Sequence, residues 1–226
     1  MCTVTYLPLK NNNFILTSNR DETPLRKTIP PKTYEENGVE LTYPKDKLAG
    51  GTWIGTSNKS RLVCLLNGGF KNHKRKLPYR ISRGIIVKNI LSSKDAVAYI
   101  NKFDFSNIEP FTLILVDWYS NLETYELVWD GELKFFTKLK QQPKIWSSST
   151  LYNQEIKQLR KDWFVDWLKQ NKNYTQKDIL FFHENENLGT AETSPKMKRN
   201  FTETVSITSV QKNGEMIDIT YLNLLD

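Results

Sequence analysis

The chain begins Met1-Cys2-Thr3-Val4-Thr5-Tyr6 and, after a polar turn, continues Phe14-Ile15-Leu16-Thr17-Ser18-Asn19-Arg20-Asp21-Glu22. Both stretches are rich in Thr, Val, Ile and aromatic residues, which is the composition of β-strands. If the two strands pair as a hairpin, the polar cluster at the end of the second strand returns to the start of the chain. The hairpin therefore predicts a site in which a cysteine faces an arginine and a carboxylate.

Cys2 becomes an N-terminal nucleophile if Met1 is removed, which the small size of a cysteine at position 2 permits. The thiolate is the reactive form of cysteine, and a free thiol has a pKa of about 8.5. The exposed α-amine, with a pKa of about 7.7–8.0, takes the thiol proton in the same way as in N-terminal threonine enzymes. We expect Asp21 to orient this amine and Arg20 to stabilise the thiolate.

An acyl carbon under attack also needs donors for its oxyanion. Two candidates stand at predicted strand ends: Asn67, beside two glycines, and Ser148, within a run of hydroxyl residues. Structural interpretations stay open for each group. Cys2 alone is typical of a small buried hydrophobe, and Arg20 and Asp21 could pair with each other and anchor a loop. Asn67 could be part of a simple turn, and the serine run could cap the helix that follows it.

The rest of the chain predicts strands in hairpin pairs, separated by helices. Residues 26–47 contain three prolines and are expected to form a long surface loop, of the kind that often acts as a lid. Hairpin pairs favour antiparallel sheets, with helices against their outer faces. The expected strands are 50–57, 61–66, 111–118, 124–129, 133–136, 204–210 and 216–222, and the expected helices are 85–91 (with strand as an alternative), 93–103 with Ser93 as N-cap, 153–172 and 175–183.

At 226 residues the chain is long enough for one large domain with its own core, and we expect a single domain over 1–226. It carries 32 Lys and Arg against 25 Asp and Glu, a formal charge of +7. That charge makes nucleic-acid binding a hypothesis to weigh, but no helix-turn-helix, zinc-finger or RNP-like pattern accompanies it. We therefore expect no nucleic-acid partner.

The two cysteines favour a reducing compartment. Cys64 lies in an apolar strand pattern, which leaves Cys2 without a disulfide partner. No signal peptide is visible, and no segment reaches the roughly 20 apolar residues of a membrane helix. We expect a cytoplasmic protein with no integral membrane segment. The two histidines, His73 and His183, are expected at the surface, and no metal-binding motif is present.

Several short motifs together resemble one known family. They are Met1-Cys2-Thr3, the stretch 18–24 (Ser-Asn-Arg-Asp-Glu-Thr-Pro), the stretch 50–55 (Gly-Gly-Thr-Trp-Ile-Gly), Leu65-Leu66-Asn67, Ser82-Arg83-Gly84 and the closing strand 204–208. This set is similar to the NRDE-motif family, also called the transport and Golgi organisation protein 2 family. That family in turn resembles N-terminal-nucleophile (Ntn) cysteine hydrolases, such as choloylglycine hydrolases and penicillin V acylases.

The resemblance implies an α+β fold, the Ntn-hydrolase-like four-layer αββα sandwich with largely antiparallel sheets. It also implies hydrolysis or acyl transfer of a small amide or thioester through a thioester on Cys2, without a cofactor. Two positions depart from the amidase pattern. Those enzymes carry Arg-Asn-x-Asp, so Asn19 and Asp21 match while Arg20 comes two residues late, and Ser148 stands where they have an asparagine.

The same resemblance implies an alternative, because animal relatives are linked to haem handling and to lipid or acyl-CoA metabolism. A non-enzymatic binding and trafficking protein would then hold haem or an acyl ligand in the same pocket. The basic loop Lys71–Lys76 would meet its propionates or phosphates.

Overall fold

The computed structural model describes residues 3–225. Within them the chain forms two compact units, one of residues 3–25 with 142–225 and the other of residues 26–141. Each unit holds one antiparallel sheet with two helices against it. The expected single domain over 1–226 stays a prediction. Cys2 lies outside the described residues.

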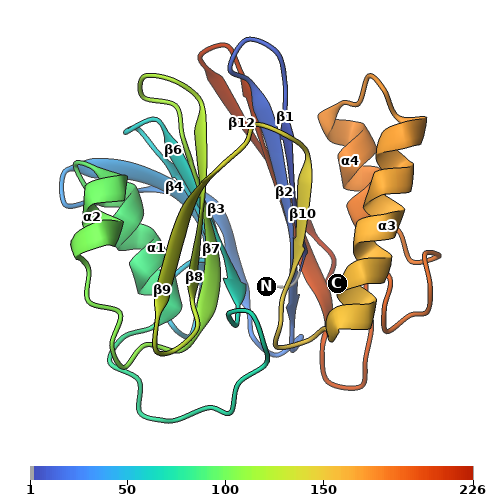
Figure 1. Ribbon diagram of the computed structural model, residues 1–226, viewed down its shortest axis with the longest axis horizontal. Coiled ribbons are helices and arrows are strands. Elements are labelled where there is room, and N and C mark those ends of the chain that lie inside the picture. The colour runs from blue at the N-terminus through green and yellow to red at the C-terminus, as the bar shows by residue number, and fades with distance from the viewer. Residues whose placement is uncertain (1–2, 226) are drawn as a thin grey trace. The chain divides into compact units, whose positions relative to one another are not determined.

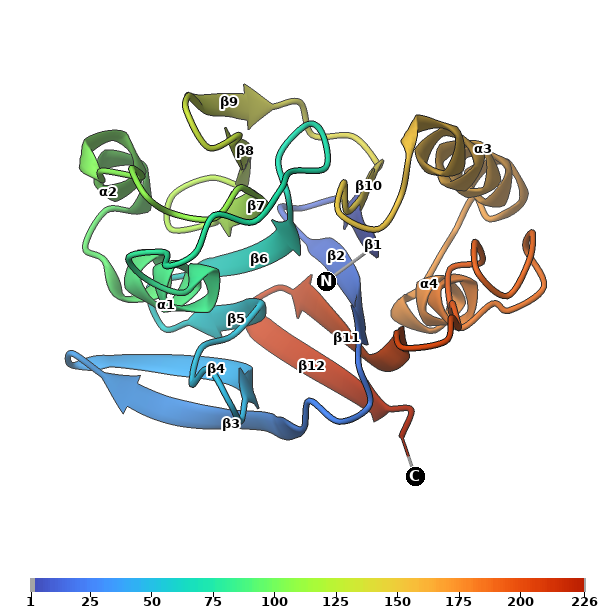
Figure 2. The same ribbon diagram turned by 90° about the horizontal axis from the view of Figure 1, so that it is seen from below.

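The first unit contains a five-stranded sheet in the order β10-β1-β2-β11-β12, which can be followed in Figure 2. β1 pairs with β2 on one side and with β10 on the other, in both cases antiparallel. The expected first hairpin is therefore confirmed. The strand bounds are β1 Thr3–Pro8, β2 Phe14–Glu22, β10 Lys144–Ser147, β11 Glu203–Asn213 and β12 Met216–Asn223.

Two helices, α3 (Gln154–Gln170) and α4 (Gln176–His183), cover one face of this sheet (Figure 1). Both begin at a side-chain cap, because the Asn153 side chain accepts from the backbone of Ile156 and Thr175 forms a reciprocal capping box with Asp178. The apolar contact between helices and sheet is small. It centres on Leu7, Ile15, Phe164, Ile179 and Phe182.

The second unit contains a seven-stranded sheet in the order β3-β4-β5-β6-β7-β8-β9, in which each strand pairs with the next along the chain. The hairpins expected around residues 58–60 and 130–131 are confirmed. The bounds are β3 Thr28–Glu36, β4 Val39–Asp46, β5 Ile54–Ser57, β6 Arg61–Asn67, β7 Phe111–Asp117, β8 Glu123–Trp129 and β9 Lys134–Leu139.

The surface loop expected over residues 26–47 is wrong, since that segment forms the β3–β4 hairpin. Its turn is Asn37-Gly38, with φ of 54° and 73°, the pair of positive angles that a two-residue hairpin turn requires. β4 alternates with Val39, Leu41 and Tyr43 buried. Pro30 and Pro31 lie in β3, an edge strand, where a missing N–H costs least. Pro44 lies in β4, beyond the two residues of that strand that pair with β5.

The helices α1 (Arg83–Ser92) and α2 (Ala96–Lys102) pack on one face of this sheet over a large apolar core. The expectation that Ser93 caps the second helix is wrong. Asp95 is the N-cap, and its carboxylate accepts from the backbone N–H of Ala98 at 2.9 Å. Ser93 instead ends α1, where the buried Arg61 of β6 donates to its carbonyl.

Gly51 and Gly84 explain why the stretch 50–55 and the motif Ser82-Arg83-Gly84 occur together in this sequence. A Cβ on Gly51 would lie 2.8 Å from the carbonyl carbon of Gly84, and one on Gly84 would lie 2.9 Å from the backbone nitrogen of Thr52. The start of α1 therefore approaches the segment before β5 backbone to backbone, and Thr52 donates to the Gly84 carbonyl. Only glycine at both positions allows this approach.

Between residues 3 and 225, the longest helix falls short of the length and apolar character that a membrane crossing needs.

Candidate functional site

The start of β1 is where the first unit gathers most of the predicted site residues. Thr3, the first described residue, pairs with Asn19 of β2 on one side and with Ser147 of β10 on the other. The same end of the sheet therefore holds Asn19, Arg20, Asp21 and Ser148. Cys2 directly precedes Thr3 in the sequence, but it lies outside the described residues.

Alternation along β2 divides the Asn-Arg-Asp cluster between two faces of the sheet. Ile15, Asn19 and Asp21 share the face that α3 and α4 cover, as their contacts with these helices and the loop before α3 show. The Arg20 side chain points to the opposite face of the sheet and is buried, with 3% of its surface exposed. Arg20 and Asp21 therefore serve different sides of the sheet.

Asp21 has both carboxylate oxygens held by buried hydroxyl groups. Tyr152 donates to Oδ2 at 2.9 Å, and Thr204 donates to Oδ1 at 2.7 Å. Each hydroxyl oxygen also accepts a bond, from Arg160 Nη2 at 2.9 Å and from the Met197 N–H at 3.0 Å. Because each hydroxyl has one hydrogen and its oxygen is already accepting, that hydrogen is directed to Asp21.

Arg160 is the centre of this buried network. It comes from α3, is 1% exposed, and its guanidinium lies 3.8 Å above the centre of the Tyr152 ring. It donates to Thr3 Oγ1 and to the carbonyls of Thr193 and Ser194. A buried charge is tolerated when its hydrogen-bonding groups are satisfied in this way. The network thus links α3, the start of β1, a loop and the Asp21 carboxylate.

Asn19 uses its whole side-chain amide within the fold. Its Nδ2 donates to the carbonyls of His183 at 3.0 Å and Pro195 at 2.8 Å, and its Oδ1 accepts from His183 Nδ1. Asn19 therefore ties β2 to the end of α4 and to the loop that follows. Its expected catalytic part stays a prediction.

The expectation that His183 lies at the surface is wrong, because the ring is fully buried. With Nδ1 donating to Asn19, Nε2 is the acceptor for the Thr5 hydroxyl at 2.8 Å, which fixes the neutral tautomer. Burial, reinforced by the positive charge of Arg160, lowers the pKa of His183 to about 3. His183 follows Ile179 by four residues on the apolar stripe of α4, and this spacing was the missed signal.

Ser148 lies in the turn that follows β10 and is 1% exposed. Its hydroxyl bonds to Thr150 at 2.9 Å, and its carbonyl accepts from the backbone N–H of Tyr152. The alternative of a helix cap is wrong for this run, because Asn153 caps α3. The turn places Tyr152 against Asp21, and the oxyanion role of Ser148 stays a prediction.

Sequence reasoning missed Tyr152, Arg160 and Thr204. Arg160 did leave a signal, since it stands midway between Ile156 and Phe164 on the stripe of α3 that faces the sheet. A charged residue in that position needs a buried partner. Tyr152 and Thr204 left no comparable signal, because their role depends on a turn and on a β-bulge between Thr204 and Ser206.

Asn67 belongs to the second unit. It is the last residue of β6, pairs with Phe111 of β7 and is half-buried. Gly68 follows with φ of 84°, and a Cβ on Gly69 would lie 3.0 Å from the backbone of Asp130. The expected abrupt strand end is confirmed, while the oxyanion role of Asn67 stays a prediction.

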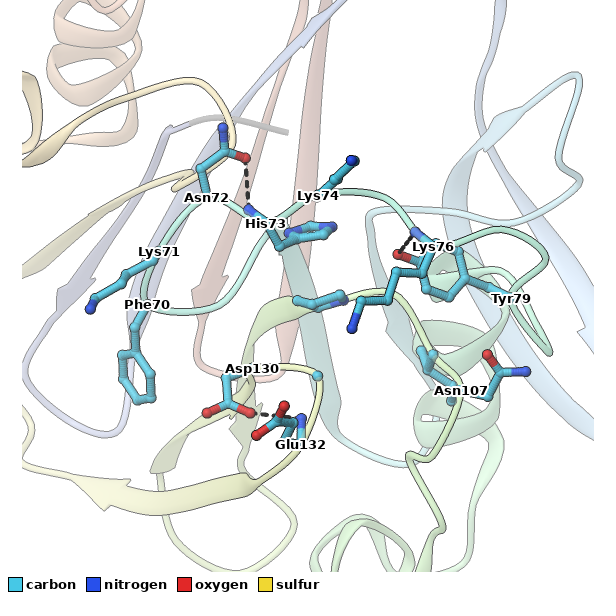
Figure 3. A pocket seen from close by; sticks show the side chains of 13 residues that line it. Phe70, Lys71, Asn72, His73, Lys74, Lys76, Tyr79, Asn107, Asp130 and Glu132 are labelled. Carbon is cyan, nitrogen blue, oxygen red and sulfur yellow. Dashed lines mark hydrogen bonds between the residues drawn. The ribbon is translucent and has the colours of Figure 1, made fainter.

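A cavity of about 610 Å³ lies beneath the basic loop of the second unit (Figure 3). The loop is anchored by Glu109, which meets His73, Arg75 and Arg83 at 3.4, 3.2 and 3.1 Å. Burial lowers the pKa of Arg83, and the charge of Glu109 opposes that shift.

The lysines of this loop do not converge on one point. In Figure 3 the side chain of Lys76 extends toward the middle of the cavity, whereas Lys71 and Lys74 point outward in different directions. Asp130 and Glu132 lie on the opposite wall, in the turn between β8 and β9. The cavity thus offers one inward cation beside two carboxylates, rather than a cluster of three lysines.

Among residues 3–225, no three His, Cys, Asp or Glu side chains gather where they could hold a metal ion. His183 has both ring nitrogens engaged, and His73 Nε2 is directed to Glu109.

Comparison with solved structures identifies the fold. The N-acylethanolamine-hydrolysing acid amidase orthologue of Caenorhabditis elegans superposes with a TM-score of 0.64 at 16% identity, over 92% of each chain. A single-residue variant of conjugated bile acid hydrolase from Clostridium perfringens gives 0.55 at 10% identity, over 99% of this chain and 92% of that one. Penicillin V acylase from Agrobacterium tumefaciens gives 0.52 at 12% identity, over 99% and 86%.

The expected α+β Ntn-hydrolase-like fold with antiparallel sheets is therefore confirmed. The sequence itself matches the family described as Transport and Golgi organisation 2 over residues 1–219, and the chain belongs to that family. No curated protein sequence matches the chain significantly.

Proposed function

We propose that the protein is an N-terminal cysteine hydrolase or acyltransferase that acts on a small amide or thioester. The observation that carries the proposal is the Asp21 carboxylate. It is 4% exposed, both its oxygens are oriented by hydroxyl donors, and it lies at the sheet end where β1 begins. The neighbours in fold support the same chemistry, since their names describe an acid amidase, a conjugated bile acid hydrolase and a penicillin V acylase.

In the proposed reaction, removal of Met1 frees the α-amine of Cys2. The amine takes the thiol proton, Sγ attacks the acyl carbon, and the amine or thiol leaving group departs with that proton. Water then attacks the thioester and releases the acid, or a second nucleophile takes the acyl group. Asp21 would orient the amine, and its fixed carboxylate spares the reorganisation that a mobile group requires.

The other site residues have proposed parts that follow from their chemistry. Arg20, buried on the face opposite to Asp21, would stabilise the thiolate. Ser148 would donate to the oxyanion, and Asn19 would hold β2 in place through its amide bonds. An unmodified N-terminal thiol suits a reducing compartment, so we also propose a cytoplasmic location.

Two mass measurements test this proposal. Intact mass of the protein isolated from its natural source is expected to show loss of Met1. Incubation with p-nitrophenyl acetate is expected to add one acetyl group, and peptide mapping should place it on Cys2 rather than on the buried Cys64. Cys2→Ala is the control. Retention of Met1, or acetylation that is unchanged in Cys2→Ala, would reject the proposal.

The cavity beneath the basic loop favours a second candidate, a binding and trafficking protein for an anionic ligand such as haem or a long-chain acyl-CoA. Its support is the cavity volume of about 610 Å³ and the inward cation Lys76 beside Tyr79, although Asp130 and Glu132 on the opposite wall carry negative charge. His183 has both ring nitrogens in hydrogen bonds, whereas His73, which lines the cavity, has only Nε2 directed to Glu109.

Titration with haem and with palmitoyl-CoA tests the second candidate. Saturable binding that weakens about tenfold in Lys76→Glu, and not in the outward-pointing Lys74→Glu, is expected from the loss of one charge-assisted contact. Absence of saturable binding to both ligands would reject it.

A further inference from the structure

We infer that Tyr152 and Arg160 are positioning residues for Asp21, and that Arg160 acts on the Asp21 carboxylate through the Tyr152 hydroxyl. The inference rests on the proposed function, since it assigns Asp21 its part in the reaction. It adds two residues that lie outside the NRDE cluster and that come from α3 and the loop before it.

The direction of the hydrogen bonds carries the inference. Arg160 has no acceptor atom, so Nη2 must donate to the Tyr152 oxygen at 2.9 Å. Tyr152 must then direct its single hydrogen to Asp21 Oδ2 at 2.9 Å. The chain Arg160, Tyr152, Asp21 therefore has one possible polarity, and it delivers a donor to the carboxylate.

Burial makes this arrangement rigid. Arg160 is 1% exposed, Tyr152 is 2% exposed and Asp21 is 4% exposed, so solvent does not compete for their bonds. The guanidinium stacks 3.8 Å above the Tyr152 ring, and Arg199 lies 5.2 Å from the centre of the same ring. The phenol is thus fixed in position as well as in hydrogen-bond direction.

A purely structural explanation accounts for only some of these contacts. Satisfying Arg160 requires acceptors, which are the carbonyls of Thr193 and Ser194, the hydroxyl of Thr3 and the Tyr152 oxygen. The Tyr152 bond to Asp21 adds nothing to that requirement. Its effect falls on one oxygen of the carboxylate that lies at the start of β1.

The test uses the whole protein and the rate of p-nitrophenyl acetate turnover on Cys2. In this step the Cys2 sulfur bonds to the acetyl carbon, the ester C–O bond breaks and p-nitrophenolate leaves. Tyr152→Phe removes one oxygen atom and keeps the ring. We expect the maximum acylation rate to fall about tenfold with little change in the saturation constant, because a group needed only for positioning lowers kcat.

A double-mutant cycle separates positioning from stability. If Tyr152 acts through Asp21, Tyr152→Phe should slow wild type about tenfold but should change Asp21→Asn less than twofold. Equal slowing in both backgrounds would overturn the inference. Arg160→Lys, which keeps a charge and a donor, should recover part of the rate that Arg160→Met loses, and failure of the lysine variant to exceed methionine would also count against it.

Tyr174→Phe is the matched control, because Tyr174 lies in the same unit and its hydroxyl faces the Pro8 carbonyl, far from Asp21 in the hydrogen-bond network. Its acylation rate should equal that of wild type. The two failures are distinguishable. If Asp21→Asn acylates as fast as wild type, the proposed part of Asp21 is wrong; if Asp21→Asn is slow and Tyr152→Phe is not, only the positioning inference fails.

Discussion

The layers between helices and sheet differ between the two units, because one is mainly apolar and the other is mainly polar. In the second unit, α1 and α2 pack on β4, β6, β7 and β8 through a continuous apolar core. In the first unit the apolar cluster is confined to one end, and the rest of the layer is a buried polar network around Asn19, Asp21, Arg160 and His183. Each of these four side chains is at least nine-tenths buried.

The difference supports the proposal that the sheet of the first unit carries the active site. Apolar packing is the less demanding way to join helices to a sheet, since every buried polar group must find its partner or cost free energy. A buried charged network is weak evidence for stability. Its retention in the first unit is consistent with a need to hold Asp21 in one orientation.

The largest expected effect comes from replacing a network residue with an apolar residue of similar size. Asn19→Leu leaves two carbonyls and the His183 N–H without their partner, and we expect a loss of about 4 kcal/mol in the free energy of unfolding. Urea unfolding at pH 7 measures it. In the second unit Leu113→Met should cost less than about 1.5 kcal/mol, because apolar volume is conserved. Equal losses of stability in Asn19→Leu and Leu113→Met would show that the polar and apolar layers do not differ in their tolerance of substitution.

The second prediction concerns an apolar residue in the core of the second unit. Leu115 of β7 is fully buried in the apolar core, and Leu115→Ala should lower the free energy of unfolding by about 3 kcal/mol through the cavity it creates. The same variant should retain the wild-type rate of Cys2 acylation under conditions where both proteins are folded. A slower rate in the folded variant would mean that the apolar layer also positions the site.

The third prediction concerns pH. The pKa of His183 is lowered to about 3 in the folded protein, against about 6.5 in the unfolded chain. The stability linked to its neutral ring is complete above pH 6.5 and is lost as pH falls toward 3. Between pH 7 and pH 5 the loss should be about 2 kcal/mol. His183→Gln should be less stable at pH 7 but should lack this part of the pH dependence; identical slopes in both proteins would contradict the account.

The smallest expected effect isolates one hydroxyl. Thr5→Val removes the donor to His183 Nε2 and should cost about 1 kcal/mol. Its control is Thr33→Val on the exposed Thr33–Thr42 pair between β3 and β4, which should change stability by less than about 0.5 kcal/mol. A larger loss of stability in Thr33→Val than in Thr5→Val would show that burial does not determine how much these hydrogen bonds contribute to the free energy of unfolding.

The comparison also explains what the sequence could predict. Strand periodicity, glycine turns and helix stripes located most elements, because these signals depend on neighbouring residues. The β3–β4 hairpin was hidden by prolines that an edge strand tolerates, although Asn37-Gly38 marked its turn. The short motifs identified the family and the fold, and both are confirmed.

The site was only partly predictable for a physical reason. Asp21 was found because it stands in a dense local cluster, whereas its partners Tyr152 and Thr204 lie 131 and 183 residues away along the chain. Their hydroxyls are brought to Asp21 by a turn and a bulge that no sequence periodicity encodes. His183 was misplaced because a polar residue on an apolar stripe was taken as exposed rather than as paired.

The most direct test of the central claim is the rate of Cys2 acetylation by p-nitrophenyl acetate in wild type, Asp21→Asn and Glu22→Gln, followed by intact mass at a mildly alkaline pH. Glu22 is the matched control, the neighbouring carboxylate, which lies at the end of β2 and accepts from the Thr23 N–H. The account predicts that Asp21→Asn is slower by about 100-fold, the scale of a positioned acid or base, and that Glu22→Gln stays within about twofold of wild type. Equal rates in wild type and folded Asp21→Asn would contradict it.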